Sequence, residues 1–443
     1  MKSFIQTLKN IWKIEDLKAR ILFTLSILLV YRFCAHVTLP GIDPAQLQAL
    51  KSQTSGGIMS ILDMFSGGAF SNASIVALGI MPYISASIMV QLLGIAIPFF
   101  QKMQREGESG RRKINQITRY LTLIILVIQA PTYLVNLHNQ LPDSAFLMHG
   151  TTFRVVCTII LMSGTMFIMW LGERITDKGI GNGISLLIMV GIIARLPVSL
   201  VQELAMRLEG RGGGLVAFLL EIVIWLLVIA VSILLVQGVR KIPVQYAKRV
   251  VGNKQYGGVR QYIPLKVNAA GVMPIIFAQA LMMVPVTLAG FAASGDSVSN
   301  FVLAFADITG FWYNAVNALL IVLFTYFYTA VTINPTQMAD DMKRNGGFIP
   351  GVKPGKKTVE YLDSIMSRIT LPGSLFLAFV AILPAFASLL GISMQFAQFF
   401  GGTTLLIMVG VVLDTLQQVE SHLLIRHYDG LMKSGRIKGR SGA

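Results

Sequence analysis

The sequence predicts an all-α integral membrane protein, with ten transmembrane helices in two pseudo-symmetric, inverted halves of five and a short re-entrant helix. Of the 443 residues, 54% are hydrophobic and only 13% are charged, whereas soluble domains carry about 25% charged residues. The mean hydropathy is +0.66. The sequence contains many apolar stretches of about 20 residues, and a helix of that length crosses a bilayer. A bilayer must therefore solvate most of this surface, and residues 1–443 are expected to form one membrane-embedded domain.

Ten apolar stretches have the length of membrane spans. They are residues 20–38, 74–97, 117–137, 153–172, 184–205, 215–236, 269–291, 313–333, 371–390 and 402–424. A Gly-rich break at 211–214 divides the chain into an N-terminal half, 20–210, a C-terminal half, 211–430, and a tail, 431–443. Five spans in each half would invert the second half relative to the first, an arrangement common in transport proteins.

Residues 58–72 are apolar but too short to cross the bilayer. The segment contains Asp63 and the pair Gly67 and Gly68, and about 20 residues are needed for a spanning helix. We interpret it as a re-entrant half-helix. Because irregular backbone at membrane depth is tolerated only inside protein or along a wet cavity, this segment predicts a cavity within the bundle.

The distribution of charge predicts the orientation. Of the 37 Lys and Arg residues, 31 lie in six segments: 1–20, 99–119, 173–182, 237–266, 334–368 and the tail from 425. Arg32 and Arg195 lie near span ends on the opposite side. Since cytoplasmic loops of membrane proteins are enriched in Lys and Arg, both termini are predicted to be cytoplasmic.

Isoleucines form stripes on two predicted helices. Ile80, Ile84 and Ile88 recur every four residues, and so do Ile184 and Ile188, which places each set on one helix face. Helix packing is the simpler interpretation. The alternative, favoured by the neighbouring re-entrant segment, is a hydrophobic constriction that excludes ions by narrowness and dewetting.

Two cytoplasmic loops are longer and more basic than a connection requires. The 237–266 loop contains seven cations, three tyrosines and no acidic residue, and the 334–368 loop surrounds the Gly- and Pro-rich bend FIPGVKPG with cations. These charges fit the general cytoplasmic bias or anionic lipids. They also fit docking of an RNA surface or an acidic protein.

Signals of chemistry are weak. The glycine-rich segment 179–183 follows no strand, so a tight turn is favoured over a phosphate loop. His422 and His427 are five residues apart and cannot share a helix face. Asp414 and Glu221 are isolated ionisable groups in or near spans, and we expect Glu221 to reach water at an interface. The sequence shows no pairing of a nucleophile with a general base and no set of metal ligands. We therefore predict neither an enzyme nor a cofactor.

Six stretches closely resemble the SecY family, the central subunit of the bacterial protein-conducting channel. They are MFSGGAFSNASIVALGIMPYISASI from Met64, EGESGRRKINQITRY from Glu106, GTMFIMWLGERITDKGIGNGIS from Gly164, PLKVNAAGVMPIIFA from Pro264, NGGFIPGVKPG from Asn345 and FGGTTLLI from Phe400. The resemblance covers nearly the whole chain.

The resemblance implies the parts of a channel. The implied plug is residues 58–72, with Ile58, Ile61, Leu62, Met64, Phe65, Gly67, Gly68 and Phe70. The implied pore ring is Ile80, Ile84, Ile184, Ile188, Ile276 and Ile407. The implied lateral gate toward lipid carries a polar cluster of Ser85, Gln129 and Gln279. Unfolded secretory chains would pass the ring, and signal peptides or membrane segments would leave sideways.

The resemblance also implies partners and a location. In the family, the cytoplasmic loops bind the translating ribosome and the SecA motor ATPase, small SecE and SecG subunits accompany the pore, and the complex lies in the bacterial plasma membrane. The implied docking residues are Arg240, Lys241, Lys248, Arg249, Arg260, Lys343, Arg344, Lys353, Lys356 and Lys357. Lys353 stands where the family usually has Arg, and Lys cannot form the planar bidentate contacts of Arg.

Two other classes of protein compete with this interpretation. An ion-coupled secondary transporter would need a solute site at the membrane midplane, and the sparse intramembrane charge disfavours it. A membrane anchor that only assembles a complex would have no need of a re-entrant segment.

Overall fold

The computed structural model describes residues 14–47, 63–148, 150–209, 213–246, 249–251, 254–256, 260–268, 270–279, 281–282 and 309–433. The chain forms two compact units. One comprises Met1–Ser199 and Val411–Ala443, and the other comprises Leu200–Gly410. Both boundaries fall within a helix, namely α9 (Gly183–Leu208) and α17 (Gly402–Lys433).

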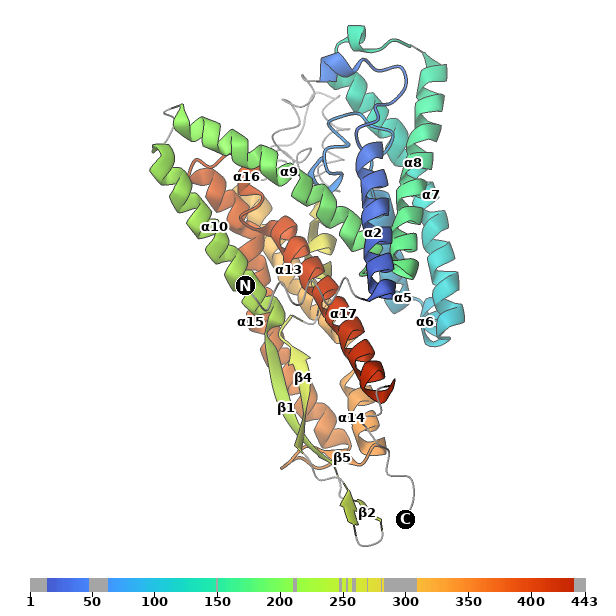
Figure 1. The fold of residues 1–443 in the computed structure, drawn as a ribbon, viewed down its shortest axis with the longest axis vertical. Coiled ribbons are helices and arrows are strands. Elements are labelled where there is room, and N and C mark those ends of the chain that lie inside the picture. Colours follow the sequence, from blue (N-terminus) through green and yellow to red (C-terminus); the bar gives the residue numbers. More distant parts are fainter. Residues whose placement is uncertain are drawn as a thin grey trace. The chain divides into compact units, whose positions relative to one another are not determined.

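The first unit is a helical bundle (Figure 1). Its helices are α2 (Glu15–Cys34), α5 (Met81–Ala96), α6 (Pro98–Arg105), α7 (Glu108–Gln140), α8 (Thr151–Lys178), the first part of α9 and the greater part of α17, with short 3₁₀ turns at Pro44–Gln46 and Asp143–Ala145. Leu39, Leu137, Cys157 and Leu161 contribute to its buried core. The glycine-rich 179–183 segment is a turn, and the Asn182 side chain caps α9 by accepting from the amides of Ile184 and Ser185 at 3.1 and 3.3 Å.

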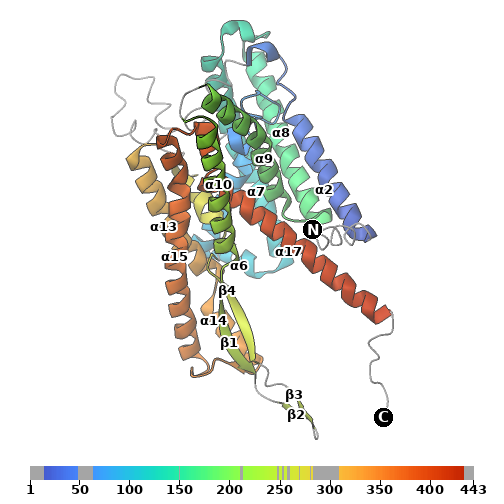
Figure 2. The same cartoon turned by 60° about the vertical axis from the view of Figure 1, so that its left-hand side comes forward.

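The second unit contains the remaining helices. They are α10 (Gly214–Gln237), a helical stretch at 273–279, α13 (Phe311–Thr332), α14 (Pro335–Arg344), α15 (Lys356–Leu389), α16 (Met394–Ala397) and the start of α17. Helices α13 and α15 run side by side in both ribbon views (Figures 1 and 2). Ile275, Ile321, Leu377 and Leu406 are fully or almost fully buried in the core of this unit.

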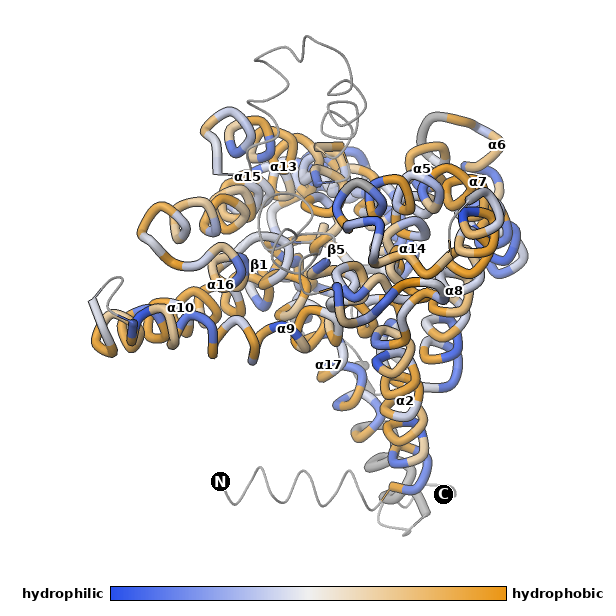
Figure 3. Tube along the Cα trace, turned by 90° about the horizontal axis from the view of Figure 1, so that it is seen from above, coloured by the Kyte–Doolittle hydropathy of each residue, from blue (hydrophilic) through white to orange (hydrophobic). Residues whose placement is uncertain are grey.

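Seven helices of the described chain are long and apolar enough to cross a membrane, and the bent pair α5 and α6 would make eight. The two members of that pair differ in direction by 103°. Helix α10 has the highest hydropathy and leaves Leu219, Val223 and Leu227 exposed, and Figure 3 shows hydrophobic residues along it. Large exposed apolar faces are stable only against lipid or a partner. The chain is a mostly helical, multi-pass membrane protein.

Each predicted span except the second and the seventh overlaps one observed helix over most of its length, although α7, α15 and α17 extend beyond the predicted bounds and α2, over the first span, is not among the seven candidate membrane helices. The second span was predicted to begin at residue 74, but residues 75–80 form turns and helix α5 begins at Met81. Pro82 is favourable at this start, because a proline in the first turn lacks only an amide that the helix leaves unpaired in any case. Of the seventh span, 269–291, only 273–279 and 281–282 are helical among its described residues.

The prediction of an all-α chain misses a small β-sheet. Strands β1 (Val239–Tyr246), β4 (Arg260–Lys266) and β5 (Gly347–Phe348) form an antiparallel sheet in the order β4-β1-β5. Strands β2 (Arg249–Val251) and β3 (Lys254–Tyr256) form a second pair. In β1, exposed Lys241 precedes buried Ile242 and Val244, the two-residue alternation of a strand with one buried face.

Candidate functional site

The re-entrant segment is the most unusual backbone in the first unit. Every residue from Asp63 to Ser71 is buried, yet only Asp63–Phe65 is helical and the chain continues as turns as far as Ala73. The described part is therefore a buried coil of turns rather than the predicted half-helix. Three of the predicted plug residues, Ile58, Ile61 and Leu62, lie outside the described residues.

This 63–72 segment is folded onto itself by its own polar groups. The Asp63 carbonyl accepts from the Gly68 amide at 2.8 Å and from the Ser66 hydroxyl at 3.0 Å. The Asp63 carboxylate accepts from the Ser71 amide at 2.7 Å, and the Ser66 hydroxyl oxygen accepts from the Phe70 amide at 3.0 Å. These bonds close a compact loop without helical periodicity.

Three carbonyls of the loop accept hydrogen bonds from side chains of two helices, and those of Ser66 and Phe70 also accept from the amides of Ala69 and Ala73 at 3.4 and 3.1 Å. On α2, the Tyr31 hydroxyl donates to the Ser66 carbonyl at 3.2 Å and the Arg32 guanidinium donates to the Gly67 carbonyl at 2.8 Å. On α7, the Tyr133 hydroxyl donates to the Phe70 carbonyl at 3.0 Å. The Gly67 carbonyl is the one of these three that depends on a side-chain donor alone, and in a bilayer, without water, an unpaired carbonyl would cost several kcal/mol. The side-chain donors thus complete the pairing of this irregular backbone.

An ion pair joins the segment to α9. The Arg195 guanidinium is paired with the Asp63 carboxylate and also donates to the Ser71 hydroxyl at 2.7 Å. The Asp63 side chain is 9% exposed and the Arg195 side chain 28%. The segment is thus held by side chains of α2, α7 and α9, all within the first unit.

The Gly67 and Gly68 pair allows the close approach that these contacts need. Both residues have positive φ, +65° and +91°, a conformation that favours glycine. A Cβ on Gly67 would lie 2.6 Å from the Gly191 Cα of α9, and one on Gly68 would lie 3.0 Å from the Arg195 guanidinium. Side chains here would force the segment away from α9.

Sequence reasoning missed four residues that hold this segment: Tyr31, Arg32, Tyr133 and Arg195. The two arginines were used only to assign orientation. Their signal was available, because they fall on the side that the charge distribution predicts to be poor in cations and each lies within a predicted span. Cations in spans are costly and usually face a partner.

The predicted ring residues are distributed over both units. Ile80 caps the start of α5 and is buried, Ile84 is half-buried one turn later, and Ile184 and Ile188 occupy the first turns of α9. All four belong to the first unit, whereas half-buried Ile276 and buried Ile407 belong to the second. Their convergence into one ring stays a prediction.

The predicted gate residues are likewise divided. Ser85 is half-buried on α5 and Gln129 is exposed on α7, both in the first unit. In the second unit, the Gln279 amide donates to the Thr403 hydroxyl of α17 at 2.6 Å. The structure thus supplies a partner for Gln279 that the sequence did not indicate, and the gate itself stays a prediction.

The two basic loops form one folded element, which we call the basic platform: strands β1, β4 and β5 with helix α14 and the start of α15 (Figure 1). Its core joins Ile242 and Val244 of the first loop to Met342, Ile349 and Leu362 of the second. The predicted docking residues with described side chains are all exposed, namely Arg240, Lys241, Lys343, Arg344, Lys353, Lys356 and Lys357. Lys248 lies outside the described residues, and only the backbone of Arg249 and Arg260 is described.

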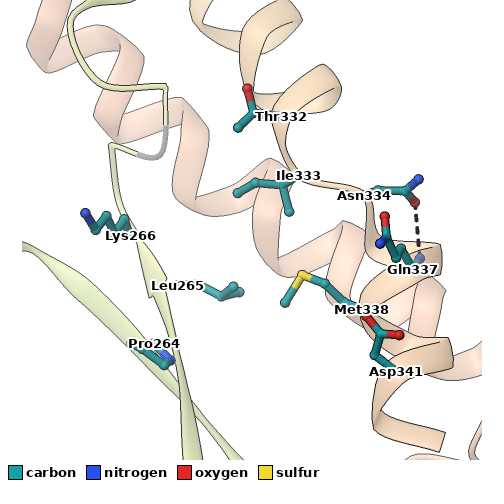
Figure 4. Close-up of a pocket in the computed structure, with 9 residues that line it drawn as sticks. All are labelled: Pro264, Leu265, Lys266, Thr332, Ile333, Asn334, Gln337, Met338 and Asp341. Atoms are coloured by element: carbon teal, nitrogen blue, oxygen red, sulfur yellow. Dashed lines mark hydrogen bonds between the residues drawn. The ribbon is translucent and has the colours of Figure 1, made fainter. Parts of the chain in front are cut away.

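A cavity of about 510 Å³ lies at the base of the platform, where β4 meets α14 (Figure 4). Leu265, Ile333 and Met338 supply apolar walls, and Lys266 and Asp341 supply opposite charges from different elements. Asn334 caps α14 by accepting from the Gln337 amide at 3.3 Å. Walls of such mixed character favour no single ligand chemistry.

A buried charge cluster lies in the second unit. Arg207 of α9 pairs with Glu203 one turn earlier, at 3.1 Å, and with Glu221 of α10. Glu203 also accepts from the Ser393 amide at 2.9 Å, which ties in the loop before α16. The expectation that Glu221 reaches water is wrong, because its side chain is 8% exposed and paired with Arg207. Asp414 is exposed.

Apolar helices that expose lipid-facing surface and enclose a buried, irregular segment define a polytopic helical membrane protein of the channel type. The model of the SecY family matches residues 74–416. The protein translocase subunit SecY of Halalkalibacterium halodurans is 44% identical over 435 residues, covering 97% of this chain and all of the relative. That of Vibrio cholerae is 41% identical over 432 residues and 96% of each chain. The chain belongs to the SecY family.

Solved structures agree in fold. A protein-conducting channel matches with a TM-score of 0.61 and 19% identity, over 91% of this chain and 92% of the other. A SecY protein whose plug domain stabilises the closed state of the translocation channel matches with a TM-score of 0.60 over the same shares, also at 19% identity. This chain therefore has the fold of a protein-conducting channel and is a pore subunit rather than an enzyme.

Proposed function

We propose that the chain is the pore of a bacterial plasma-membrane translocase and that the structure represents its resting, plugged state. Unfolded secretory proteins pass through the pore, and membrane segments leave it laterally through a gate that includes Ser85, Gln129 and Gln279. The proposal also includes ten spans in two inverted halves, with both termini in the cytoplasm. The seven to eight candidate spans of the described residues support it in part.

One observation carries this proposal: the segment 63–72, buried except for half-buried Asn72, is held by donors from three helices although only Asp63–Phe65 is helical. A segment that served only to connect two spans would lie at a surface, where water satisfies its backbone. A buried irregular segment that is held by a few separate hydrogen bonds, in contrast, can move out of its site as one unit once those bonds break. We therefore assign residues 58–72 as the plug.

The basic platform is the proposed docking surface. Its exposed cations belong to one folded element, so the ribosome and a motor ATPase would meet a preformed surface rather than two separate loops. Solved relatives include Sec61 in a canine ribosome–channel complex and a yeast Ssh1 complex bound to a ribosome. For this chain we propose the ribosome, a SecA motor, SecE and SecG subunits, signal peptides and nascent chains, and anionic lipids as partners. The driving energy comes from partners, so the pore itself needs no cofactor.

Crosslinking of an arrested secretory chain tests the proposed pathway. A photoreactive residue at Ile80 or Ile276 should crosslink to the arrested chain, because both positions are proposed to line the ring. Val216, which is 76% exposed on the apolar face of α10, provides the matched control and should crosslink to lipid instead. Absence of crosslinks from both ring positions while transport proceeds would contradict the proposal.

A further inference from the structure

We propose that the ion pair between Asp63 and Arg195 is the latch that keeps the plug in its closed position. The proposal rests on the assignment of residues 58–72 as the plug and adds the interaction that sets its resting stability. Arg195 acts as a positioning residue: it fixes the plug through Asp63 and Ser71 and is assigned no other part in transport.

The first argument is connectivity. One oxygen of the Asp63 carboxylate accepts from the Ser71 amide at 2.7 Å, and the other is paired with Arg195. The same guanidinium nitrogen of Arg195 donates to the Ser71 hydroxyl at 2.7 Å. The ion pair therefore closes the loop of the plug and fastens that loop to α9 at a single point. Movement of the plug away from α9 must break it.

The second argument compares the contacts that hold the plug. The other three cross-helix bonds, from Tyr31, Arg32 and Tyr133, end on neutral carbonyls. A hydrogen bond to a neutral group contributes less than the loss of one partner from a buried ion pair costs. Asp63 is the only acidic residue of segment 58–72. Removing either charge of this pair should therefore weaken the closed position more than removing any one carbonyl donor.

The third argument concerns release. A latch must open without leaving both charges buried, and the Arg195 side chain is already 28% exposed. When the plug moves, Asp63 leaves with it and Arg195 stays on α9, where part of its side chain already lies outside the packed interior. Separation of the pair therefore costs less than it would in a sealed core, because this guanidinium does not have to stay fully buried without its partner.

A double-mutant cycle tests the latch. The variants are Asp63→Asn, Arg195→Gln and the double substitution, each with a single reporter cysteine at Asn72 after Cys34→Ala and Cys157→Ala. The readouts are the labelling rate of the reporter with a membrane-impermeant maleimide and the ion conductance of the resting channel in planar bilayers. Each single variant should raise the labelling rate by about tenfold or more, since it leaves one buried charge unpaired.

The double variant should raise labelling by clearly less than the product of the two single effects, because neither charge is then left alone. Arg195→Lys should be intermediate, since it keeps the charge but replaces the planar guanidinium with a strongly hydrated ammonium on a flexible stem. Arg154→Gln, at an exposed arginine of α8, is the control and should behave like the wild type. The Lys variant keeps the cycle interpretable if a neutral variant fails to fold.

Transport by the wild-type channel distinguishes failure of the latch from failure of the proposed function. It is measured with a secretory protein in proteoliposomes that contain the channel, its partner subunits and the motor. If the wild type transports protein but the single variants label at the wild-type rate, the latch is wrong and the channel function stands. Strictly multiplicative effects in the double variant would also overturn the latch. If the wild type transports nothing, the proposed function itself fails.

Discussion

At the scale of single residues, two tyrosines and two arginines decide whether an irregular segment can be buried. Tyr133 illustrates how a single side chain contributes to this burial. Its hydroxyl donates a second hydrogen bond to the Phe70 carbonyl at 3.0 Å, while its ring packs edge-on against the Phe70 ring at a centroid distance of 4.8 Å. One side chain thus supplies both the polar and the apolar contact.

Tyr133→Phe should loosen the plug without changing the ring packing. The substitution removes one of the two hydrogen bonds that the buried Phe70 carbonyl accepts and leaves the one from the Ala73 amide at 3.1 Å, so the expected cost is about 0.5–1.5 kcal/mol. We expect a lower midpoint of thermal unfolding and a higher resting conductance. Tyr120→Phe, at a residue 67% exposed on the same helix, is the control. Equal conductance of the two variants would show that this hydrogen bond does not hold the segment.

At the scale of elements, the folded platform shows that the two basic loops are parts of one structure. In the sequence, the two long basic loops are separated by about seventy residues and read as independent connections. In the structure, Gln245 of β1 pairs with Phe348 of β5, and residues of both loops share a buried core. Charges from distant stretches of sequence are thereby fixed on one element.

Ile242→Ala should disturb both loops although it alters no cation. Ile242 is 2% exposed in the shared core, and such truncations cost about 2–5 kcal/mol. We expect faster limited proteolysis at residues 343–357 and weaker binding of the motor and ribosomes, with membrane insertion retained. Val239→Ala, 42% exposed on the same strand, should have little effect. Unchanged proteolysis of the second loop would contradict the shared core.

At the scale of the whole molecule, helix α9 links the proposed parts. It carries ring positions Ile184 and Ile188, then Gly191 and Arg195 against the plug, and finally Glu203 and Arg207 in the buried charge cluster. Helix α9 extends through the boundary between the two units. A ring that includes Ile276 and Ile407 must likewise draw on both units, so its seal is a property of the entire chain.

Ile84→Gly together with Ile184→Gly should raise ion leak through the resting channel, because the ring would lose two of its six side chains. Glycine in a helix also costs about 1 kcal/mol at each site. The control for that cost is Met89→Gly with Ile193→Gly, at exposed positions of the same two helices, 50% and 40% exposed. Wild-type conductance of the ring variant in planar bilayers would count against the ring assignment.

The sequence by itself determined that the chain is a multi-pass helical membrane protein of the SecY family, because apolar runs, charge asymmetry and family motifs are all local in sequence. It also singled out residues 58–72, with Asp63 and the two glycines, as the segment that we propose to be the plug. Only the tertiary structure decided what holds that segment, since Tyr31, Arg32, Tyr133 and Arg195 meet it from helices distant in sequence. The same holds for the strands of the platform, whose pairing joins residues 245 and 348, and for the burial of Glu221 against Arg207. Hydrophobicity is a property of each stretch of chain, whereas the satisfaction of buried polar groups depends on which stretches meet.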